Sequence, residues 1–599
     1  MRVIRTLLLI LLVAGSWRMA PAAEKAAREL LSPSSALVVE IRQPLDAIEN
    51  PLIGDIWELL CQTRGVKQAL NSPGIDRFRQ AGRFIEKSLG VDWRTGINRL
   101  TTGGIVFAVE PQGAGAEPTV TVIVTADGEQ TVSQFMESVQ AEIRRAAASR
   151  AASDAENAKS PTRPSSDVES TRYRSFTCHR AGNGHYALAG RQLLVSNSRR
   201  GLEAALDRLA DADSSKPFDP PASLRLVDSA GKPPLVQATV NLKLLKEDPK
   251  AQAALTIPAN DPAPVFLLGG YLDLLRRADF AAAGVFVSGP TCELKVRIPV
   301  GADGAAAGLS GYFASETTVS APRLLRPAGT IFSAGWFRDY NKLWDARGKL
   351  LSSEIISRLE AVNAKAQAEG AKVGPVDLAE MLGPHFRFVV SRPGETAYQV
   401  KLDNRLPALA LIVSVRDAAR FRQRVLTAVD RLLWLGVASN NLGQIKPSEY
   451  RGATISTLHF NERPDFTDSE KRVLYNFDPS YSLTRDELIV GSTSEIVRNV
   501  IDELDRQAAL PQALGATQER LTDHQELSFV ELAEYFKEFV PHFVQQAVLN
   551  RGLSTADAEK EIAVLRQILL RMAGLTSIAS IARNHFEISI RVGPVEEER

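Results

Sequence analysis

Runs in which apolar and polar residues alternate recur along the chain, and they predict β-strands joined by tight turns. In residues 293–298 every second side chain is apolar, so one face of the strand is apolar and the other is polar. Amphipathic stretches of about 10 to 20 residues separate such runs and predict helices. Strands of this kind are typical of antiparallel sheets with one face against helices. The pattern therefore predicts an α+β fold of largely antiparallel sheet, with helices packed on one face.

The order of these elements repeats at a separation of about 290 residues. The clearest match joins residues 186–195 and 481–490, each of which reads as strand, turn and strand and then runs into a helix. Four further strand-like runs match in the same order: 37–41 with 330–334, 105–109 with 386–390, 120–124 with 409–413, and 293–298 with 587–592. Because matches that keep one order indicate an internal repeat, we predict a tandem duplication of one α+β unit.

The repeat predicts the domain boundaries. A segment rich in Gly, Ala and Ser separates the two copies and is expected to be a linker. Within the first copy, residues 145–171 are rich in Ala, Ser and charged side chains and have no apolar period, which predicts a disordered insert. The predicted parts are a signal peptide (1–23), a first α+β unit (24–302), a linker (303–321), a second α+β unit (322–594) and a tail (595–599).

The first 23 residues have the pattern of a secretory signal peptide. Arg2 and Arg5 form a basic start, residues 7–14 are apolar, and small residues follow at 20–23. An apolar helix of this length spans only about 12 Å, whereas a bilayer core is about 30 Å thick. No later stretch has 18 uninterrupted apolar residues, so no integral membrane segment is expected after signal cleavage. We expect an exported protein, periplasmic or extracellular.

The charge of the chain is balanced. It has 71 Lys and Arg residues and 70 Asp and Glu residues, a formal net charge of +1. Nucleic-acid binding depends on neutralising phosphates, so this balance gives no general attraction to nucleic acid. Hydrophobic residues make up 44% and charged residues 24% of the chain, which is ordinary for a globular protein and excludes a wholly disordered one. We therefore expect a folded chain without a nucleic-acid partner.

Three cysteines, Cys61, Cys178 and Cys292, are too few for a disulfide framework in an exported chain of this size. Two alternatives stay open. One disulfide and one free thiol is the first, and three buried thiols is the second.

Cys178 lies beside His179 and close to His185 in the sequence, which is the nearest approach to a metal-binding cluster. We expect a hairpin with its turn at Asn183-Gly184, in which His179 lies opposite Leu188. The two histidines then point to opposite faces, and Cys178 lies about 13 Å from His185. Zinc ligands lie about 2.0–2.3 Å from the ion, so no metal site is predicted.

Other polar residues that recur in both copies have structural explanations. Asp92 and Asp377 each precede a short helix, where a carboxylate accepts a hydrogen bond from a free backbone N–H. Two matched pairs lie on the polar faces of strands, where solvated side chains or weak surface ion pairs are expected. These pairs are Glu293 with Arg297 and Glu587 with Arg591.

No polar constellation is found in both copies. Residues 491–494 precede a helix, and a helix N-terminus is a place where anions bind, but the first copy shares only the capping residues. We therefore assign no catalytic, cofactor-binding or metal-binding residue and expect no cofactor. The two copies have in common only their apolar positions, turns and helix caps, which favours a binding or structural role.

Several stretches together resemble a family of exported bacterial proteins of unknown function built from tandem α+β units. The stretches are LLSPSSALVVEI (30–41), VDW (91–93), GGIVFAVEP (103–111), PTVTVIV (118–124) and YALAGRQLLVSNSRRGLEAALDRL (186–209). The resemblance implies export and an α+β fold. It supplies no catalytic residue.

The sequence thus predicts an exported, soluble, non-enzymatic protein that binds or scaffolds another macromolecule of the bacterial cell envelope. One alternative is an envelope hydrolase that uses His385 or His459, and another is a carrier of an apolar ligand. An enzyme is expected to have a concave polar pocket with perturbed titratable groups. A carrier is expected to have a large apolar cavity, and a scaffold an exposed apolar patch.

Overall fold

The computed structural model describes residues 26–594 apart from 43–49, 71–72, 114–115, 157–167, 211–217, 256–260, 301–309, 314–320, 369–373, 395–404, 428–442, 462–466, 468–473, 475, 510–519 and 583. The signal peptide and the tail predicted above lie outside these residues. The chain divides into two compact units. The first is Met1–Ala254 with Ala278–Pro299, and the second is Leu255–Arg277 with Val300–Arg599.

The first unit is an antiparallel sheet with helices on both faces. Across the sheet the strand order is β10-β9-β8-β1-β2-β3-β7-β6-β5-β4. The strands are β1 (Leu37–Ile41), β2 (Ile105–Glu110), β3 (Thr119–Thr125), β4 (Glu169–Tyr173), β5 (Phe176–Ala181), β6 (Gly184–Ala189), β7 (Gln192–Ser196), β8 (Val236–Asn241), β9 (Phe280–Ser288) and β10 (Thr291–Pro299). Its helical segments are η1 (Ala27–Leu30), α3 (Pro51–Leu60), α4 (Arg64–Leu70), α5 (Pro73–Leu89), α6 (Trp93–Thr101), α7 (Glu129–Glu156), α8 (Arg199–Ala210), η2 (Ala222–Leu224), α9 (Leu242–Leu245) and α10 (Pro249–Ala254).

The α+β class and the antiparallel sheet are confirmed, and helices cover two faces rather than one. Val122 and Val124 of β3 lie in a core with α5, α6 and α7, whereas Ile123 lies in a second core with α8 and η1. The reason is visible in the sequence of β3, where consecutive residues are apolar. A strand apolar on both faces needs a cover on both sides.

The second unit has a sheet of the same kind. Its strand order is β20-β19-β18-β11-β12-β13-β17-β16-β15-β14, again with antiparallel neighbours. The strands are β11 (Thr330–Phe337), β12 (Leu382–Ser391), β13 (Ala408–Val415), β14 (Gly443–Tyr450), β15 (Ala453–Phe460), β16 (Ser480–Thr484), β17 (Glu487–Gly491), β18 (Arg520–Ser528), β19 (Gly574–Ile581) and β20 (His585–Gly593). Its helical segments are α11 (Pro262–Arg277), η4 (Ser310–Tyr312), α12 (Tyr340–Asp345), α13 (Arg347–Leu350), α14 (Ser353–Ala368), α15 (Pro375–Met381), α16 (Ala418–Phe421), the π-helix η5 (Arg422–Leu426), α19 (Ser494–Ala509), α20 (Phe529–Phe536), η6 (Lys537–Phe539), α21 (Val540–Arg551) and α22 (Thr555–Met572).

The two sheets have the same strand order, because each strand from β1 to β10 occupies the place that its counterpart from β11 to β20 occupies in the second unit. The unit boundaries differ from the predicted ones at two places. Residues Leu255–Arg277 lie between β8 and β9 in the sequence but belong to the second unit. Within the predicted linker, Tyr312 of η4 is fully buried.

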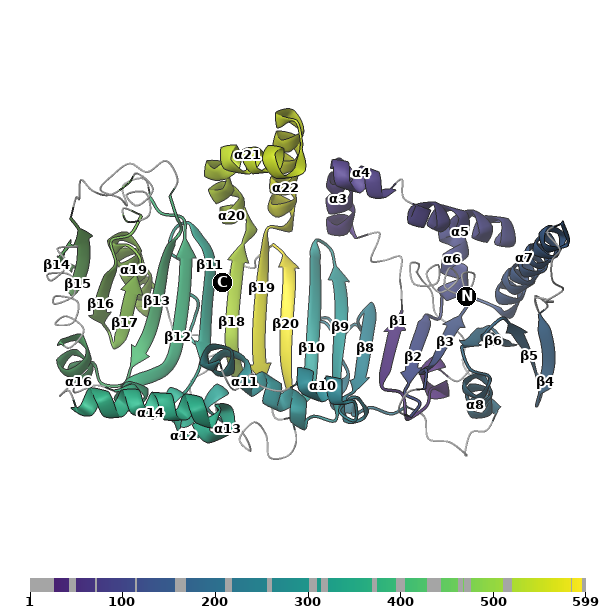
Figure 1. The fold of residues 1–599 in the computed structure, drawn as a ribbon, viewed down its shortest axis with the longest axis horizontal. Helices are drawn as coiled ribbons and strands as arrows, with labels where there is room; N and C mark the ends of the chain where they lie inside the picture. Colours follow the sequence, from purple (N-terminus) through teal and green to yellow (C-terminus); the bar gives the residue numbers. More distant parts are fainter. Residues whose placement is uncertain are drawn as a thin grey trace. The chain divides into compact units, whose positions relative to one another are not determined.

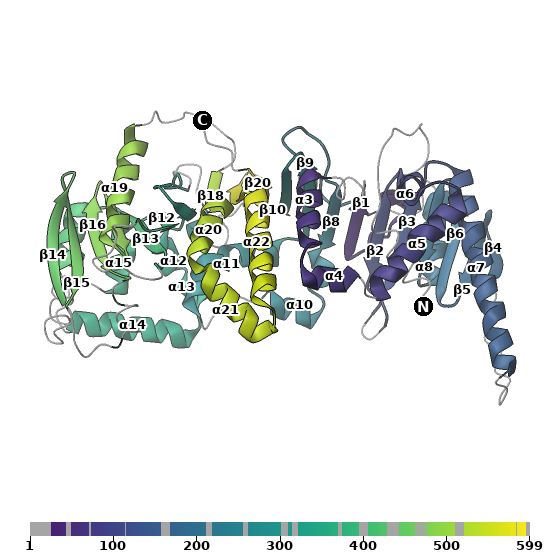
Figure 2. The same cartoon turned by 90° about the horizontal axis from the view of Figure 1, so that it is seen from above.

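The second sheet has one face covered by a helix and the other covered only in part by the described residues. On one face, Ile496, Val497 and Val500 of α19 pack against β12, β13 and β17. At one end of the other face, α15 and α16 pack around Phe421. Figure 2 shows α19 on one side of these strands and α14 on the other. In Figure 1, α20–α22 extend beyond the ends of β18 and β19, where Val544, Leu553 and Ala558 form a small core of their own.

The central part of the predicted disordered insert (145–171), residues 157–167, lies outside the described residues, and its two described ends belong to a helix and a strand. Helix α7 continues to Glu156, and strand β4 begins at Glu169. The Ala-rich composition explains the helix at its start, because Ala has the highest helix propensity and extends a helix without an apolar period.

No helix in the described ranges is long and apolar enough to cross a membrane.

Candidate functional site

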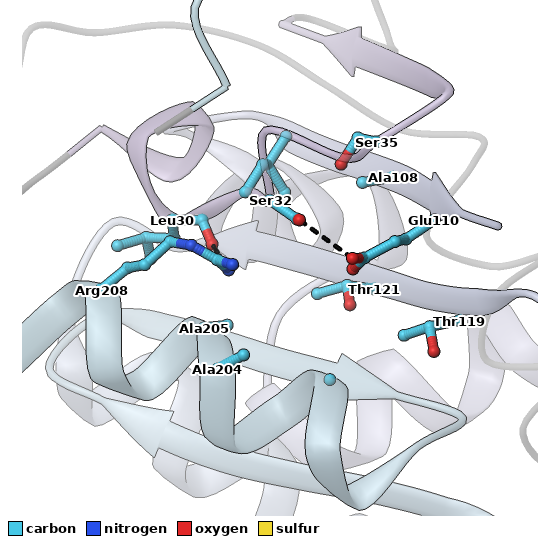
Figure 3. A pocket seen from close by; sticks show the side chains of 12 residues that line it. Leu30, Ser32, Ser35, Ala108, Glu110, Thr119, Thr121, Ala204, Ala205 and Arg208 are labelled. Carbon is cyan, nitrogen blue, oxygen red and sulfur yellow. Dashed lines mark hydrogen bonds between the residues drawn. The ribbon is translucent and has the colours of Figure 1, made fainter. Parts of the chain in front are cut away.

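A small polar pocket lies in the first unit between η1, the strands β2 and β3, and α8 (Figure 3). The Ser32 hydroxyl donates a hydrogen bond to Glu110 Oε1 at 3.1 Å, and Arg208 Nη1 donates to the Leu30 carbonyl at 3.2 Å. The cavity volume is about 20 Å³. One water molecule needs about 10–15 Å³ of such volume, so the pocket has room for a water and not for an organic substrate.

Two charged groups of opposite sign set the electrostatics of this pocket. Burial lowers the pKa of Arg208, and the nearby Glu110 and Asp207 carboxylates act against that shift. Gly201 allows α8 to approach the sheet closely, because a Cβ there would lie 2.6 Å from Thr119 Cγ2. The pocket is therefore a small space with polar walls, left where α8 packs closely on the sheet.

The matched position in the second unit carries the opposite charge. Glu503 of α19 stands where α8 has Arg208, and it accepts a hydrogen bond from the backbone N–H of Arg326 at 3.3 Å. Arg326 in turn donates two hydrogen bonds to Glu526, both at 2.7 Å. His524 Nε2 lies 3.5 Å from Glu526 Oε1. Burial acts to raise the pKa of Glu526, but the Arg326 and His524 contacts outweigh it and lower the pKa to about 2.

A polar constellation does recur in both units, contrary to the expectation from the sequence. Tyr173 donates to both oxygens of Asp207 at 3.0 Å, and Tyr450 donates to those of Asp502 at 3.0 and 2.9 Å. The residue after each tyrosine, an arginine with φ of about 50°, lies 2.8 Å from the same carboxylate. These contacts tie the turn of an edge hairpin to α8 or α19. The hydrogen bonds to the aspartates raise the pKa of each tyrosine, and the arginines act against that shift. The contacts are structural in character.

This constellation was missed because the two copies differ in length between its members. Tyr173 and Asp207 are 34 residues apart, whereas Tyr450 and Asp502 are 52 residues apart. An alignment at one offset cannot bring both members into register. The repeated Tyr-Arg dipeptide is the signal that could have found it.

The hairpin with the two histidines has a different register from the predicted one. His179 lies opposite Tyr186 and stacks on its ring at 5.0 Å, while His185 lies opposite Arg180. The two histidines are on opposite faces, as predicted, but Cys178 lies only about two residues, or about 7 Å, from His185 along the sheet. No group of three His, Cys, Asp or Glu residues within the described part of the chain is placed to hold a metal ion.

The three cysteines are all free. Cys178 is buried, and Cys61 and Cys292 are half-buried. Burial raises the pKa of the Cys178 and Cys292 thiols. The structure therefore contains no disulfide between these three cysteines.

The two aspartates have related but different roles. Asp92 caps α6, with hydrogen bonds of 3.0 Å from the N–H groups of Arg94 and Thr95, as predicted. Asp377 lies inside the first turn of α15 and accepts from the Gly374 N–H at 2.8 Å. The N-cap of α15 is thus Gly374, and the prediction for Asp377 was wrong by three positions.

The histidines of the hydrolase alternative are placed apart from each other, in β12 and β15. The backbone N–H of His385 donates to the Ser414 hydroxyl at 3.0 Å, and that hydroxyl donates to the His385 carbonyl at 3.2 Å. Both hydrogen bonds join Ser414 to the backbone of His385 and not to its imidazole ring. His459 lies opposite Gln444 in the hairpin of β14 and β15.

The residues of the two polar-face pairs differ in their surroundings. Glu293 lies 3.8 Å from Lys295, and Arg297 donates to the Arg225 carbonyl at 2.7 Å. Glu587 is buried, with 8% exposure, and Arg591 is half-buried. The matched positions therefore share their place in a strand but differ in burial, since Glu587 is buried and Glu293 is half-buried.

The units differ in an apolar surface of the second sheet, here called the apolar face and made of Phe332, Phe388, Leu409, Leu411 and Val490. Leu411 lies opposite Phe388 on one neighbouring strand and opposite Val490 on the other. Phe332 packs on Phe388 at 6.3 Å between ring centroids. Leu409, Leu411 and Val490 are 39%, 39% and 45% exposed.

The same place in the first sheet is covered. There Phe107, Val122 and Val195 lie opposite one another on β2, β3 and β7, as Phe388, Leu411 and Val490 do on β12, β13 and β17. They pack into the core formed with α5, α6 and α7, and Val122 is only 3% exposed. One register position thus has a helical cover in one unit and an exposed leucine in the other.

Comparisons with known proteins assign no family to the chain. No family model matches the chain, and no curated protein matches it. Among solved structures, crystal forms IV and III of TP0453 from Treponema pallidum are similar to 46% of this chain and 80% of theirs, with 11% identity and a TM-score of 0.23. Crystal form I is similar to 47% of this chain at 9% identity and a TM-score of 0.22.

Proposed function

We propose that this chain is a non-enzymatic binding protein of the bacterial cell envelope, and that it holds another macromolecule on the apolar face of its second unit. The observation that carries the proposal is the contrast at one register position. Leu411 is 39% exposed, and its counterpart Val122 is 3% exposed beneath helices. Contiguous exposed apolar side chains are typical of interaction surfaces.

The energetics favour a bound partner. Fully burying a Val, Leu or Phe side chain contributes about 1.5–3 kcal/mol, and the residues of the apolar face realise only part of that in the isolated chain. The face spans four neighbouring strands, β11, β12, β13 and β17. A partner that covers it gains the rest of the burial energy on a flat, preformed platform, with little ordering cost on this side.

The remaining parts of the proposal rest on the sequence. The basic start, short apolar run and small residues at the N-terminus support export, and with it an envelope location. The common strand order of the two sheets supports a tandem duplication. We propose that the two units diverged after the duplication. The first unit kept helices over this face of its sheet, and the second unit came to expose the corresponding apolar face.

The test is site-specific photocrosslinking in cells with the full chain. A photoreactive residue at position 411 or 490 is expected to capture the same envelope macromolecule. The matched control is a photoreactive residue at position 122, which the helices of the first unit cover. The captured molecule must then bind the purified chain and lose affinity at least about tenfold for Leu411→Asp.

Two outcomes would overturn the proposal. One is a product at position 411 that joins only two segments of the same chain. The other is that positions 411 and 122 yield the same products at the same level, because the apolar face then has no role of its own.

A further inference from the structure

An ion pair is buried in the second unit, away from the apolar face. Arg338 follows β11, and Asp523 is in β18; they are 2% and 8% exposed. Arg338 Nη1 donates to Asp523 Oδ1 at 2.8 Å, and Nη2 donates to Oδ2 at 3.0 Å. Burial lowers the pKa of Arg338 to about 10 and raises the pKa of Asp523. The guanidinium is still protonated at neutral pH, and its two short contacts favour the ionised form of the Asp523 carboxyl against the effect of burial. The two groups form a two-pronged contact of the kind that fixes orientation.

Helix α11 completes this ion pair. The Tyr271 hydroxyl donates to Asp523 Oδ2, and Arg338 Nη2 donates to that hydroxyl at 3.1 Å. The same nitrogen donates to the Leu267 carbonyl of α11, also at 3.1 Å. The guanidinium carbon lies 5.5 Å from the ring centroids of both Tyr271 and Tyr312. The pair is thus a binding site for one turn of α11.

The packing beneath α11 is specific to its sequence. Gly269 and Gly270 lie directly on Tyr312, and a Cβ at Gly270 would be 2.5 Å from Tyr312 Cγ. The Tyr312 hydroxyl donates to the Val265 carbonyl. Tyr271 stacks on Phe586 at 5.1 Å between centroids and meets Phe313 at 6.1 Å. Only a helix with adjacent glycines lies this close to the tyrosine.

The outer side of α11 is exposed. Leu267 and Leu268 are 48% and 51% exposed, and Arg276 and Arg277 are exposed at its end. Its buried positions, Val265, Gly269, Gly270 and Leu274, form one narrow stripe. The polar contacts with Arg338, Asp523 and Tyr312 lie on the same side of the helix as this stripe. An element held along one side only is of the kind that opens locally while the rest of a protein stays folded.

We propose that α11 is a latch on the second unit, which opens and closes on the Arg338–Asp523 pair while the sheet beneath stays folded. A buried ion pair adds little net stability over apolar packing. If α11 docks in a wrong position, however, the charges of the pair are left without their hydrogen-bond partners, which costs free energy. The pair therefore favours one docked position of α11. Opening uncovers Tyr312, Phe313 and Phe586. These form an aromatic groove whose occupant in the closed state is a helix with a Gly-Gly step.

Hydrogen exchange of the full chain, followed by mass spectrometry, tests the latch. In the unmodified chain, the amides of α11 are expected to exchange faster than those of α19. Asp523→Asn keeps the shape of the side chain and removes its charge, and it is expected to speed the exchange of α11 by at least about tenfold while α19 is unchanged. Glu487→Gln is the matched control, because it breaks another ion pair of low exposure in the same unit, 2.7 Å from Arg387.

Tyr271→Phe supplies a second, milder variant that removes only a hydroxyl, and it carries the test if Asp523→Asn does not fold. The latch is supported if exchange rises in α11 alone. It is overturned if α11 and α19 exchange together in every variant, because α11 is then an ordinary part of one core. It is also overturned if neither variant changes α11, because the ion pair then does not control it.

Discussion

At the scale of single residues, the reliable sequence signals were those with a local physical cause. Asp92 was predicted to cap a helix and does so, because the partner N–H groups are two and three residues away. Asp377 also accepts a hydrogen bond from a backbone N–H at the start of a helix, but it does so from the N3 position, three residues after the predicted N-cap position. Sequence spacing alone does not distinguish the N-cap from the N3 position. Contacts between distant residues, such as Tyr450 with Asp502, depend on the fold and could not be predicted from spacing.

The repeated tyrosine contacts predict a matched pair of stability effects. Tyr173→Phe and Tyr450→Phe are each expected to lower the urea midpoint of their unit, because each removes a hydrogen bond to a carboxylate. Tyr481→Phe is the control, since its buried hydroxyl has no hydrogen-bond partner among the described residues. Urea unfolding of the three variants measures the difference. Equal effects at all three positions would show that the Tyr–Asp contacts do not stabilise the units.

Glu526 predicts a pH dependence of stability. Its pKa is about 2 in the folded chain, below the ordinary value of 4.5, so its contribution is complete above about pH 4.5 and is lost as the pH falls toward 2. The contribution is of the order of 3 kcal/mol. Glu526→Gln is expected to destabilise the second unit at pH 7 and to flatten the decline below pH 4.5. An unchanged decline in urea unfolding between pH 5 and 3 would contradict the assignment.

At the scale of elements, periodicity predicted the strands well and their register less well. The hairpin of β5 and β6 has its two-residue turn at Gly182-Asn183, one position before the predicted Asn183-Gly184. Both dipeptides suit such a turn because Gly and Asn tolerate positive φ, and Gly182 has φ of 62°. The order of strands across each sheet was not predictable, since it depends on pairings between residues far apart in the sequence.

The close approach of α11 to Tyr312 predicts the effect of a single methyl group. Gly270→Ala is expected to displace α11, because the new Cβ would lie 2.5 Å from the tyrosine ring. Tryptic cleavage after Arg276 and Arg277 of the folded chain should then become faster. Gly54→Ala in α3 is the control, because nothing lies within 4 Å of its Cβ position. If both variants are cleaved like the unmodified chain, α11 does not depend on the glycine contact.

At the scale of the whole molecule, the two sheets share one strand order and differ in what covers them. The sequence showed this sharing as ordered matches of short apolar runs. It could not show the apolar face, because Leu409 and Leu411 have the pattern of core residues and their exposure depends on whether a helix lies over β13. The pattern 120–124 reads the same as 409–413, and only the fold distinguishes buried Val122 from exposed Leu411.

The central claim is that the apolar face is open in the isolated chain and covered by a partner in the cell. The most direct measurement is maleimide labelling of Leu411→Cys in a chain whose three native cysteines are replaced by alanine, with Val122→Cys as the reference. The account predicts that position 411 is labelled in the purified chain and protected in intact cells, while position 122 is protected in both. Labelling of position 411 to the same extent in both settings, or its protection already in the purified chain, would contradict the account.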